Sequence, residues 1–162
     1  MLVVRRATAE DGPFLGQMLA VAADWRPGTT VRTVAEILAV PALARYVVGW
    51  PRPGDAGFIA EDRVAIGAAW WRLFRDSDAG YGFVDEHVPE LSIGVAPGWR
   101  LLGIGTRLLR SLIAEARRSG LSGLSLSVER DNPAVVLYER LGFGTVGVNG
   151  GALTMALSLS TD

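Results

Sequence analysis

The sequence predicts a single-domain protein of the α/β class, and three observations support this prediction. The chain has 162 residues, which suits one domain of ordinary size, and 49% of them are hydrophobic, enough to fill a sizeable core. Segments with the two-residue period of strands alternate with segments of helical period. No linker or internal repeat divides the chain. We therefore expect one domain over residues 1–162.

Apolar periodicity and turn residues divide the chain into elements. The expected strands cover residues 2–5, 57–61, 65–74, 91–95, 124–128, 145–148 and 152–159. The expected helices cover residues 11–23 and 31–39, a stretch that starts at the glycines before residue 106, and a short stretch from residue 132 to residue 142. Residues 50–55 and 75–89 are expected to be loops, the first at the surface or over a ligand cleft.

Each boundary has a local reason. In the first helix, apolar side chains recur at helical spacing, and Pro27-Gly28 breaks the chain after it. Pro41 separates the second helix from a short turn that continues to residue 46. A tight turn at residues 62–63 joins two strands, and Asn149-Gly150 predicts a hairpin at the end of the chain.

A glycine-rich segment follows the strand at residues 91–95. After a Pro-Gly break at residues 97–98, the motif Arg100-x-x-Gly103-x-Gly105 leads into an amphipathic helix. Small residues allow a close backbone approach, and the first N–H groups of a helix, at its positive dipole end, face an anion. This arrangement predicts a ligand that carries a pyrophosphate.

Other interpretations of these glycines exist. On the glycines alone, a tight strand-to-helix turn without a ligand is equally simple. A Walker loop needs Gly-Lys-Ser/Thr, and the chain has no lysine. A dinucleotide fingerprint needs a third glycine where Leu108 stands, although Glu129 supplies an acid at the end of the next strand. Both of these phosphate motifs fit less well than the interpretation that a second motif supports.

The second motif joins a strand to a short helix. Residues 124–128 alternate apolar and polar side chains, the period of a strand with one buried face. Asn132 suits the N-cap of the next helix, and Pro133 suits its first position. Gly142 suits a left-handed helix end.

Together the motifs resemble the GNAT superfamily of acetyl-CoA-dependent N-acetyltransferases. The resemblance rests on Arg100-x-x-Gly103-x-Gly105 followed by Asn132-Pro133-Ala134-x-x-Leu137-Tyr138-x-x-Leu141-Gly142-Phe143, and it is close over residues 90–143. It implies an α/β (α+β) fold with a central mixed, mostly antiparallel sheet of about six to seven strands. It also implies that the two central strands are parallel, that they splay apart, and that about four helices flank the sheet.

The resemblance implies that acetyl-CoA is the cosubstrate and that no metal is needed. The pantetheine arm is expected to pair with the backbone of residues 93–95, and the pyrophosphate to lie at residues 100–106. The expected cofactor-binding residues are Ile93, Gly94, Val95, Arg100, Leu101, Leu102, Gly103, Ile104, Gly105, Thr106, Asn132, Ala134 and Tyr138. In a chain without lysine, Arg107 and Arg130 are further candidates for phosphate contacts.

N-acetylation needs a base and an acid. An alkylammonium has a pKa near 10.4, so roughly one molecule in a few thousand is the free amine at pH 7, and a general base removes the proton from the rest. The resemblance implies Tyr138 as the hydroxyl that assists the leaving CoA thiolate, with an aromatic core residue as the alternative. Glu90 is the first candidate base, with a solvated strand-end carboxylate as the alternative. The reserve bases are Glu86, Asp85 and His87.

Aromatic residues are numerous in this chain. They include Trp25, Trp50, Trp70, Trp71, Trp99, Tyr81 and Phe83. Adjacent strand residues point to opposite faces, so one ring of the pair Trp70-Trp71 is expected in the core and the other is available to face the acceptor. Packing alone explains most of these residues, whereas a ring at the acceptor site favours an apolar, aromatic or cationic acceptor.

Composition excludes several classes of function. The net charge is −1, and no basic excess points to nucleic acid or to an anionic membrane. The absence of cysteine excludes disulfides, thiolate metal sites and a cysteine acyl-enzyme. Charged residues interrupt the apolar runs near the N-terminus, and no apolar stretch is long enough to span a membrane. We expect a soluble, cytoplasmic protein.

These observations predict an N-acetyltransferase that transfers acetyl directly from acetyl-CoA, in a ternary complex, to the primary amine of a small molecule or peptide. The alternatives are a noncatalytic acyl-CoA-binding or regulatory module, a transferase for another acyl group, and an unrelated nucleotide-binding protein. The identity of the acceptor, and the choice between a monomer and a homodimer, stay open.

Overall fold

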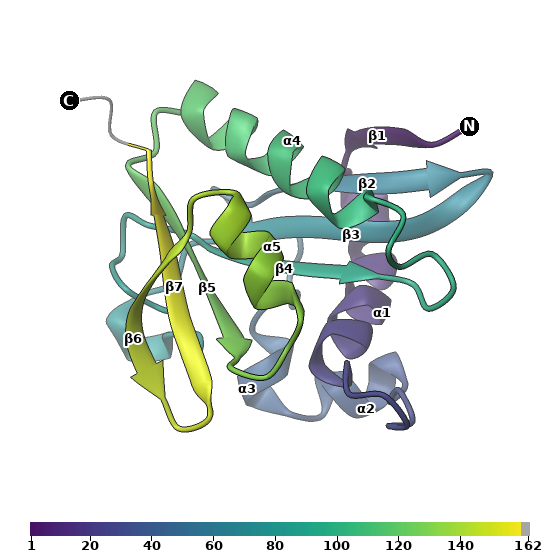
Figure 1. Cartoon of the computed structure of the whole chain (residues 1–162), viewed down its shortest axis with the longest axis horizontal. Coiled ribbons are helices and arrows are strands. Elements are labelled where there is room, and N and C mark those ends of the chain that lie inside the picture. The colour runs from purple at the N-terminus through teal and green to yellow at the C-terminus, as the bar shows by residue number, and fades with distance from the viewer. Residues whose placement is uncertain (160–162) are drawn as a thin grey trace. The chain divides into compact units, whose positions relative to one another are not determined.

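Strands from both halves of the chain belong to one mixed sheet in the computed structural model, which describes residues 1–159 (Figure 1). The strand order is β1 (Val3–Arg6), β2 (Ala56–Asp62), β3 (Val64–Arg72), β4 (Glu90–Val95), β5 (Gly123–Glu129), β7 (Ala152–Ser158) and β6 (Gly144–Asn149). Strands β4 and β5 form a parallel pair among antiparallel ones. The predicted α/β class with a mixed, mostly antiparallel sheet is confirmed. Residues 160–162, which the predicted domain includes, lie outside the described residues.

Two compact units make up the chain. The first comprises Met1–Arg72 and Ser92–Leu112, and the second comprises Leu73–Leu91 and the chain from Ile113 onward. The prediction of one domain over residues 1–162 stays a prediction. In the part of the chain that the structure describes, no helix is both long and apolar enough to cross a membrane.

The first unit contains an antiparallel three-stranded part of the sheet together with its helices. Its elements are β1 (Val3–Arg6), α1 (Gly12–Ala23), α2 (Val34–Leu38), α3 (Pro41–Ala44), β2 (Ala56–Asp62) and β3 (Val64–Arg72), and a 3-10 turn at Ala9–Asp11 leads into α1. The helix predicted over residues 31–39 begins later, at Val34, because Thr33 caps it: the Thr33 hydroxyl accepts from the Glu36 N–H, and the Glu36 carboxylate accepts from the Thr33 N–H.

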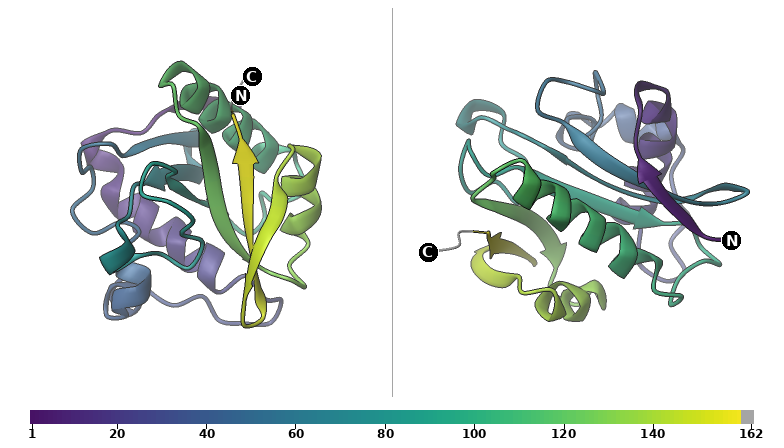
Figure 2. Two further views of the ribbon diagram at one scale, coloured as in Figure 1. Left: turned by 90° about the vertical axis from the view of Figure 1, so that its left-hand side faces the viewer. Right: turned by 90° about the horizontal axis from the view of Figure 1, so that it is seen from above.

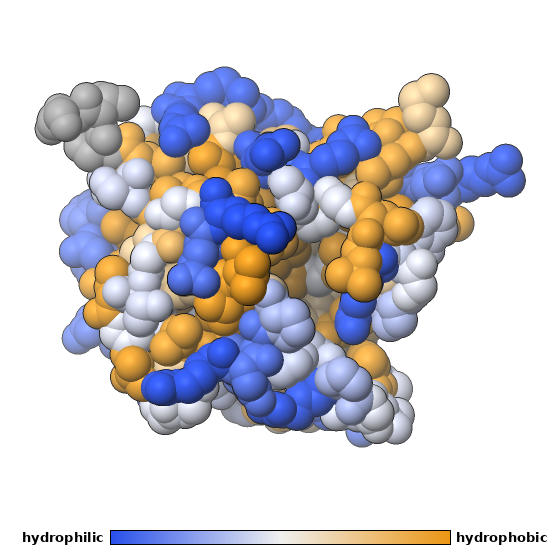
Figure 3. Space-filling view, viewed as in Figure 1, coloured by the Kyte–Doolittle hydropathy of each residue, from blue (hydrophilic) through white to orange (hydrophobic). Residues whose placement is uncertain are grey.

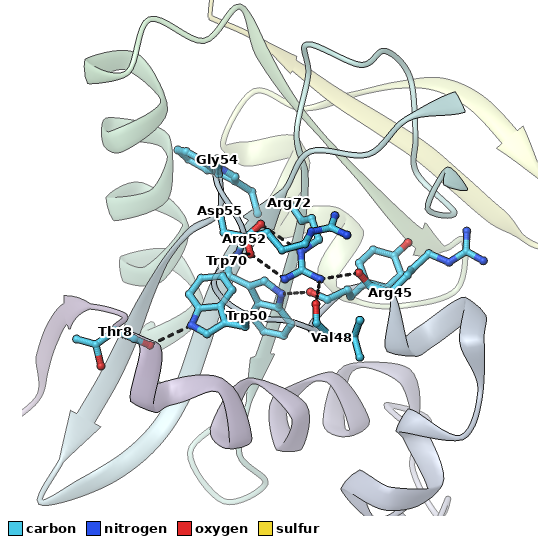
Figure 4. A network of polar contacts seen from close by, with 11 residues as sticks. Thr8, Arg45, Val48, Trp50, Arg52, Gly54, Asp55, Trp70 and Arg72 are labelled. Atoms are coloured by element: carbon cyan, nitrogen blue, oxygen red, sulfur yellow. Dashed lines mark hydrogen bonds and ion pairs between the residues drawn. The ribbon is translucent and has the colours of Figure 1, made fainter. Parts of the chain in front are cut away.

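The end of β3 is held by a buried ion pair between Arg72 and Asp55 (Figure 4). Each side chain is 1% exposed, and the Arg72 guanidinium donates to both carboxylate oxygens of Asp55, at 3.1 and 2.8 Å. The same guanidinium donates to the backbone carbonyls of Arg45 and Val48, at 3.0 and 2.6 Å. One buried cation therefore joins β3 to the connector before β2 and to the turn after α3.

Indole N–H groups reinforce the same region. The Trp50 indole donates to the Thr8 carbonyl at 3.0 Å, and the Trp70 indole donates to the Tyr46 carbonyl at 3.0 Å (Figure 4). Trp71 is also buried, and its indole donates to the Gly54 carbonyl. Both rings of the pair Trp70-Trp71 pack inside the protein, which agrees with the interpretation that packing explains most of the aromatic residues and leaves neither ring facing an acceptor. The connector of residues 50–55 is likewise tied down by its own polar contacts.

The second unit is built on the other parts of the sheet. Its elements are β5 (Gly123–Glu129), α5 (Ala134–Arg140), β6 (Gly144–Asn149) and β7 (Ala152–Ser158), with a 3-10 turn at Asp76–Asp78. The predicted terminal hairpin is present, and β7 pairs antiparallel with both β6 and β5 (Figure 2). Gly142 has φ 101°, the left-handed conformation predicted for the end of α5.

The loop of residues 75–89 is seated against β5 at a glycine. A side chain at Gly82 would come within 2.7 Å of the Leu126 carbonyl oxygen and the Ser127 nitrogen. Only a residue without a Cβ allows the two backbones to approach this closely. Gly82 thus holds the loop on the strand that carries Ser125 and Ser127.

We predict that Asp55→Ala lowers the free energy of unfolding by about 3–5 kcal/mol, because it leaves the Arg72 charge buried without its carboxylate. Denaturant unfolding measures the change. The control is Asp62→Ala, whose exposed partner is the N-terminal ammonium and whose effect should stay below about 1 kcal/mol. Equal effects of the two variants would contradict the assignment of the buried pair as the main support of this region.

Candidate functional site

The junction of β4 (Glu90–Val95) with α4 (Ile104–Arg118) is a candidate anion-binding site. The first turns of α4 are anchored by apolar side chains that the structure buries, namely Ile104, Leu108, Leu109 and Leu112. Gly67 of β3 makes room for them, because a Cβ there would lie 3.2 Å from Leu108 Cδ1 and 3.3 Å from the Gly94 carbonyl oxygen. The start of the helix is therefore fixed against the first unit by close packing.

Gly103 ends the loop and leads into α4. Its φ is 79°, which favours glycine, and nothing lies within 4 Å of the position that a Cβ would occupy. The Arg107 N–H donates to the Gly103 carbonyl at 3.1 Å, so the N–H groups before Arg107 precede the helical ladder. Gly105 and Thr106 lie in the first helical turn. The space at Gly103 and these N–H groups form a cradle with positive potential.

The loop before Gly103 presents exposed side chains. Arg100 is exposed, and its Nε donates to the Val95 carbonyl at 3.4 Å, which holds the guanidinium base near the strand end. Leu101 has a left-handed φ of 64° and is fully exposed, and Leu102 is largely exposed as well. Figure 3 shows apolar surface (orange) where this loop lies in Figure 1. Arg107, on the first turns of α4, is exposed and is available for phosphate contacts.

The N–H groups of the three predicted backbone residues of β4, which are Ile93, Gly94 and Val95, point toward two different edges of the strand. The Ala96 N–H donates to the Ile66 carbonyl of β3 at 2.8 Å. Because successive strand residues direct their N–H groups to alternate edges, Ile93 and Val95 direct theirs away from β3, and Gly94 directs its own toward β3. Gly94 also has a packing role, since a side chain there would overlap the Met18 carbonyl of α1.

Glu90 is the first residue of β4, and its side chain is only 3% exposed. This burial is inconsistent with the solvated strand-end carboxylate that was the alternative. Glu90 pairs in parallel register with Ser125 of β5, and the Ser125 N–H donates to the Pro89 carbonyl at 3.0 Å. Both residues belong to the second unit.

Ser125 is a residue that sequence reasoning missed. The alternation over residues 124–128 predicted one buried face, but Ser125 is 0% exposed, so both faces of β5 are covered at this point. Among residues 1–159, its Oγ has no hydrogen-bond partner. Ser125 lies on the face opposite Leu124 and Leu126, and nothing in the local sequence indicates that it is buried, because its burial depends on segments distant in the chain.

The reserve bases lie together on an exposed turn. Asp85 Oδ1 accepts from the His87 N–H at 2.7 Å and lies 3.1 Å from His87 Nδ1. The His87 backbone N–H, followed by its ring, holds the pKa of Asp85 below its usual range, which makes that carboxylate a weaker base. Glu86 is exposed on the same turn. Within residues 1–159, no group of three or more His, Cys, Asp or Glu side chains is placed to hold a metal ion.

The second motif builds α5 much as predicted. Asn132 Oδ1 accepts from the Ala134 N–H at 2.9 Å, but α5 begins at Ala134, so Pro133, with a φ of −56°, stands at the N-cap position that was predicted for Asn132. Tyr138 is 6% exposed, and its ring packs edge-on to Phe143 with centroids 6.0 Å apart. Burial raises the pKa of Tyr138 above its ordinary value of 10.0, so the hydroxyl keeps its proton to a higher pH than an exposed tyrosine does. Arg130, before this motif, is exposed.

A mixed α/β sheet in which β4 leads through a glycine-rich loop into α4 has the arrangement that the two motifs predicted. The model of the acetyltransferase (GNAT) family matches residues 22–143, more than half of the chain, and the chain belongs to this family. The resemblance and the acyltransferase class predicted from the two motifs are thereby confirmed.

Individual relatives agree with this family. A mycothiol acetyltransferase of Corynebacterium glutamicum (strain R) is 29% identical over 128 residues, which cover 74% of this chain and 37% of that protein. A mycothiol acetyltransferase of Gordonia bronchialis is 34% identical over 131 residues, which cover 71% of this chain and 41% of that protein. The chain thus spans less than half the length of these curated relatives.

Solved structures share the fold. The ribosomal-protein-alanine N-acetyltransferase of Brucella melitensis has a TM-score of 0.69 and 28% identity, with 97% of this chain and 99% of that chain covered. The structure of yncA from Salmonella typhimurium, which contains acetyl-CoA, has a TM-score of 0.71 and 23% identity, with 100% and 96% covered. Acetyl-CoA is the cosubstrate of the family, and the open space at Gly103 suits a phosphate-bearing ligand.

We predict that Tyr138 forms no phenolate near pH 10 while the protein is folded. The unfolded chain releases this proton near pH 10, and the folded protein releases it only at a higher pH. The free energy of unfolding therefore falls as the pH rises above about 10, and it falls less steeply in Tyr138→Phe. Phenolate absorbance, measured as the difference between the native protein and the variant, tests this. A Tyr138 signal near pH 10 in the folded state would refute it.

Proposed function

We propose that the protein is an N-acetyltransferase that transfers acetyl from acetyl-CoA directly to a primary amine in a ternary complex. The observation that carries this proposal is the open cradle at Gly103, where a left-handed glycine starts a well-anchored helix. Membership of the acetyltransferase family supports it. The acceptor class is an amine of a small molecule or of a peptide, and the proposed compartment is the cytoplasm.

Three groups of residues bind the cosubstrate in this proposal. The N–H groups of residues 103–106 hold the pyrophosphate, with Arg100 as the nearest cationic side chain in sequence. The N–H groups of Ile93 and Val95, directed away from β3, pair with the pantetheine amides. The Val95 carbonyl already accepts from Arg100, which leaves its N–H as the group offered to a ligand. The start of α5, at Asn132 and Ala134, completes the predicted set.

Tyr138 serves as the acid. A tyrosine hydroxyl is protonated at neutral pH, and burial raises the pKa of Tyr138 further, so Tyr138 is available as a hydrogen-bond donor when the CoA sulfur leaves. Its ring is held by Phe143, so the hydroxyl direction is limited. The alternative role, an aromatic core residue only, needs the ring but not the hydroxyl.

Glu90 serves as the base. Its burial at the start of β4 separates its carboxylate from bulk water, which suits a proton transfer from a bound acceptor. The exposed turn with Asp85, Glu86 and His87 offers no comparable seclusion. Proton removal by Glu90 converts the acceptor ammonium to the free amine that attacks the thioester.

We predict that Gly103→Asp lowers the affinity for acetyl-CoA by more than about tenfold, because it places a carboxylate in the cradle. Calorimetric titration with acetyl-CoA measures this affinity, and NAD and ATP are the control ligands. The matched control is Gly120→Asp, since Gly120 also has a positive φ and open space but follows the other end of α4. Gly103→Ala introduces backbone strain without a charge, so it separates the effect of strain on the affinity from the effect of the carboxylate. Gly105→Asp tests whether the first turn of α4 also contributes to acetyl-CoA binding.

Retained affinity in a folded Gly103→Asp protein, with circular dichroism like that of the native chain, would contradict the cradle. Preference for NAD or ATP over acetyl-CoA would contradict the family function itself.

We predict that Tyr138→Phe and Glu90→Gln each lower kcat by about 100-fold or more and leave the dissociation constant of acetyl-CoA within about twofold. Release of free CoA thiol is measured with peptides that begin with alanine, primary alkylamines and amino sugars as acceptors. Tyr138→Phe retains the ring that contacts Phe143, so its stability is the control for folding. An unchanged kcat in either variant would remove that residue from its role. Tight binding without turnover of any amine would favour a noncatalytic acyl-CoA-binding module.

A further inference from the structure

Ser125 is a buried hydroxyl without a partner, and it lies beside the proposed base. Its side chain is 0% exposed, and its Oγ has no hydrogen-bond partner among the residues that the structure describes. Most buried side-chain polar atoms in proteins are satisfied by protein groups or by an ordered water, so an unsatisfied one requires an explanation. Folding alone gives none, because alanine would fill almost the same volume without burying a polar atom.

The register of the sheet places this hydroxyl next to Glu90. The two residues form the parallel pair that joins β4 to β5, and the Ser125 N–H is fixed on the Pro89 carbonyl at 3.0 Å. Residues in register on neighbouring strands present their side chains on the same face, about 5 Å apart. Ser125 Oγ makes no hydrogen bond to Glu90 or to any other residue that the structure describes, so one bridging water is the group that can satisfy it.

We propose that Ser125 is a positioning residue that holds one water molecule against the Glu90 carboxylate for proton transfer. This inference rests on the proposed function, in which Glu90 is the base. In the step, the acceptor ammonium gives a proton to the water as the water gives one of its own to Glu90. The products are the free amine, an unchanged water and a neutral carboxyl group. The Ser125 hydroxyl stays un-ionised and fixes the water by a hydrogen bond.

The same step explains how a base that is 3% exposed can act on an amine. A proton moves through a buried water more easily than a bulky acceptor reaches a buried carboxylate. Gly82 seats the loop of residues 75–89 on β5 at the next two residues, Leu126 and Ser127, so the cover over this strand is held by backbone contact. The hydroxyl is therefore kept in a secluded position.

The first test is a crystal structure of the protein at a resolution that shows ordered waters. We expect one water within hydrogen-bond distance of both Ser125 Oγ and the Glu90 carboxylate, and its loss in Ser125→Ala. A dry contact, or a protein group bonded to Ser125 Oγ, would overturn the proposal. This readout needs no acceptor.

The second test compares Ser125→Ala with Ser127→Ala, the matched serine two residues along the same strand. Ser125→Ala should keep or raise Tm by a few degrees and leave the acetyl-CoA dissociation constant unchanged, while kcat falls about tenfold or more with the best amine of the acceptor panel. Ser127→Ala should keep kcat. A structural role for the hydroxyl predicts instead that Tm falls together with kcat, and that result would overturn the inference.

The two proposals fail differently. If the native protein acetylates an amine and Glu90→Gln is inactive while Ser125→Ala is fully active, the role of Ser125 is wrong and the function stands. If the native protein binds acetyl-CoA but acetylates no amine, the proposed function is wrong, and the water at Ser125 is then judged by the crystal structure alone.

Discussion

Close backbone approach at glycine is the constraint on which the candidate anion-binding site depends. Gly94 lets the Met18 carbonyl of α1 approach β4, and Gly67 lets Leu108 and Ile104 of α4 approach β3. Larger residues at these positions would push the helices outward. Without glycine at these two positions, the buried apolar face of α4 could not pack closely, and the cradle at Gly103 would no longer have a fixed direction. Close packing in the first unit thus determines where positive potential is presented.

In the second unit, the burial of polar side chains away from water has the corresponding importance. Burial raises the pKa of the Tyr138 hydroxyl, and the Glu90 side chain is taken out of water at the first residue of β4. The buried Arg72 in the first unit differs, because its charge is paired with Asp55 and with two backbone carbonyls. This fully paired charge supports the fold. A buried polar group that is fully paired stabilises structure, whereas one such as Ser125, with no partner among residues 1–159, points to chemistry.

Local signals were enough to predict several parts of the fold. The hydrogen bond of Asn132 at the start of α5, the left-handed Gly142 and the hairpin at Asn149-Gly150 depend on neighbouring residues only, and the structure contains all three, although Pro133 rather than Asn132 is the N-cap. The second helix was predicted to begin too early, because apolar spacing does not show that the capping box of Thr33 and Glu36 starts the helix at Val34. Both tryptophans of β3 are buried, although strand alternation predicted only one, since segments distant in sequence cover the second face.

The sequence by itself determined the family, the order of the elements and the glycine-rich helix start, because each is written in residue types at short spacing. Only the tertiary structure decided which polar residues leave water. The pairing of Glu90 with Ser125, the cover over β5 and the ion pair of Arg72 with Asp55 join segments far apart in the chain. The physical reason is that periodicity shows which face a side chain occupies, whereas burial depends on what packs against that face.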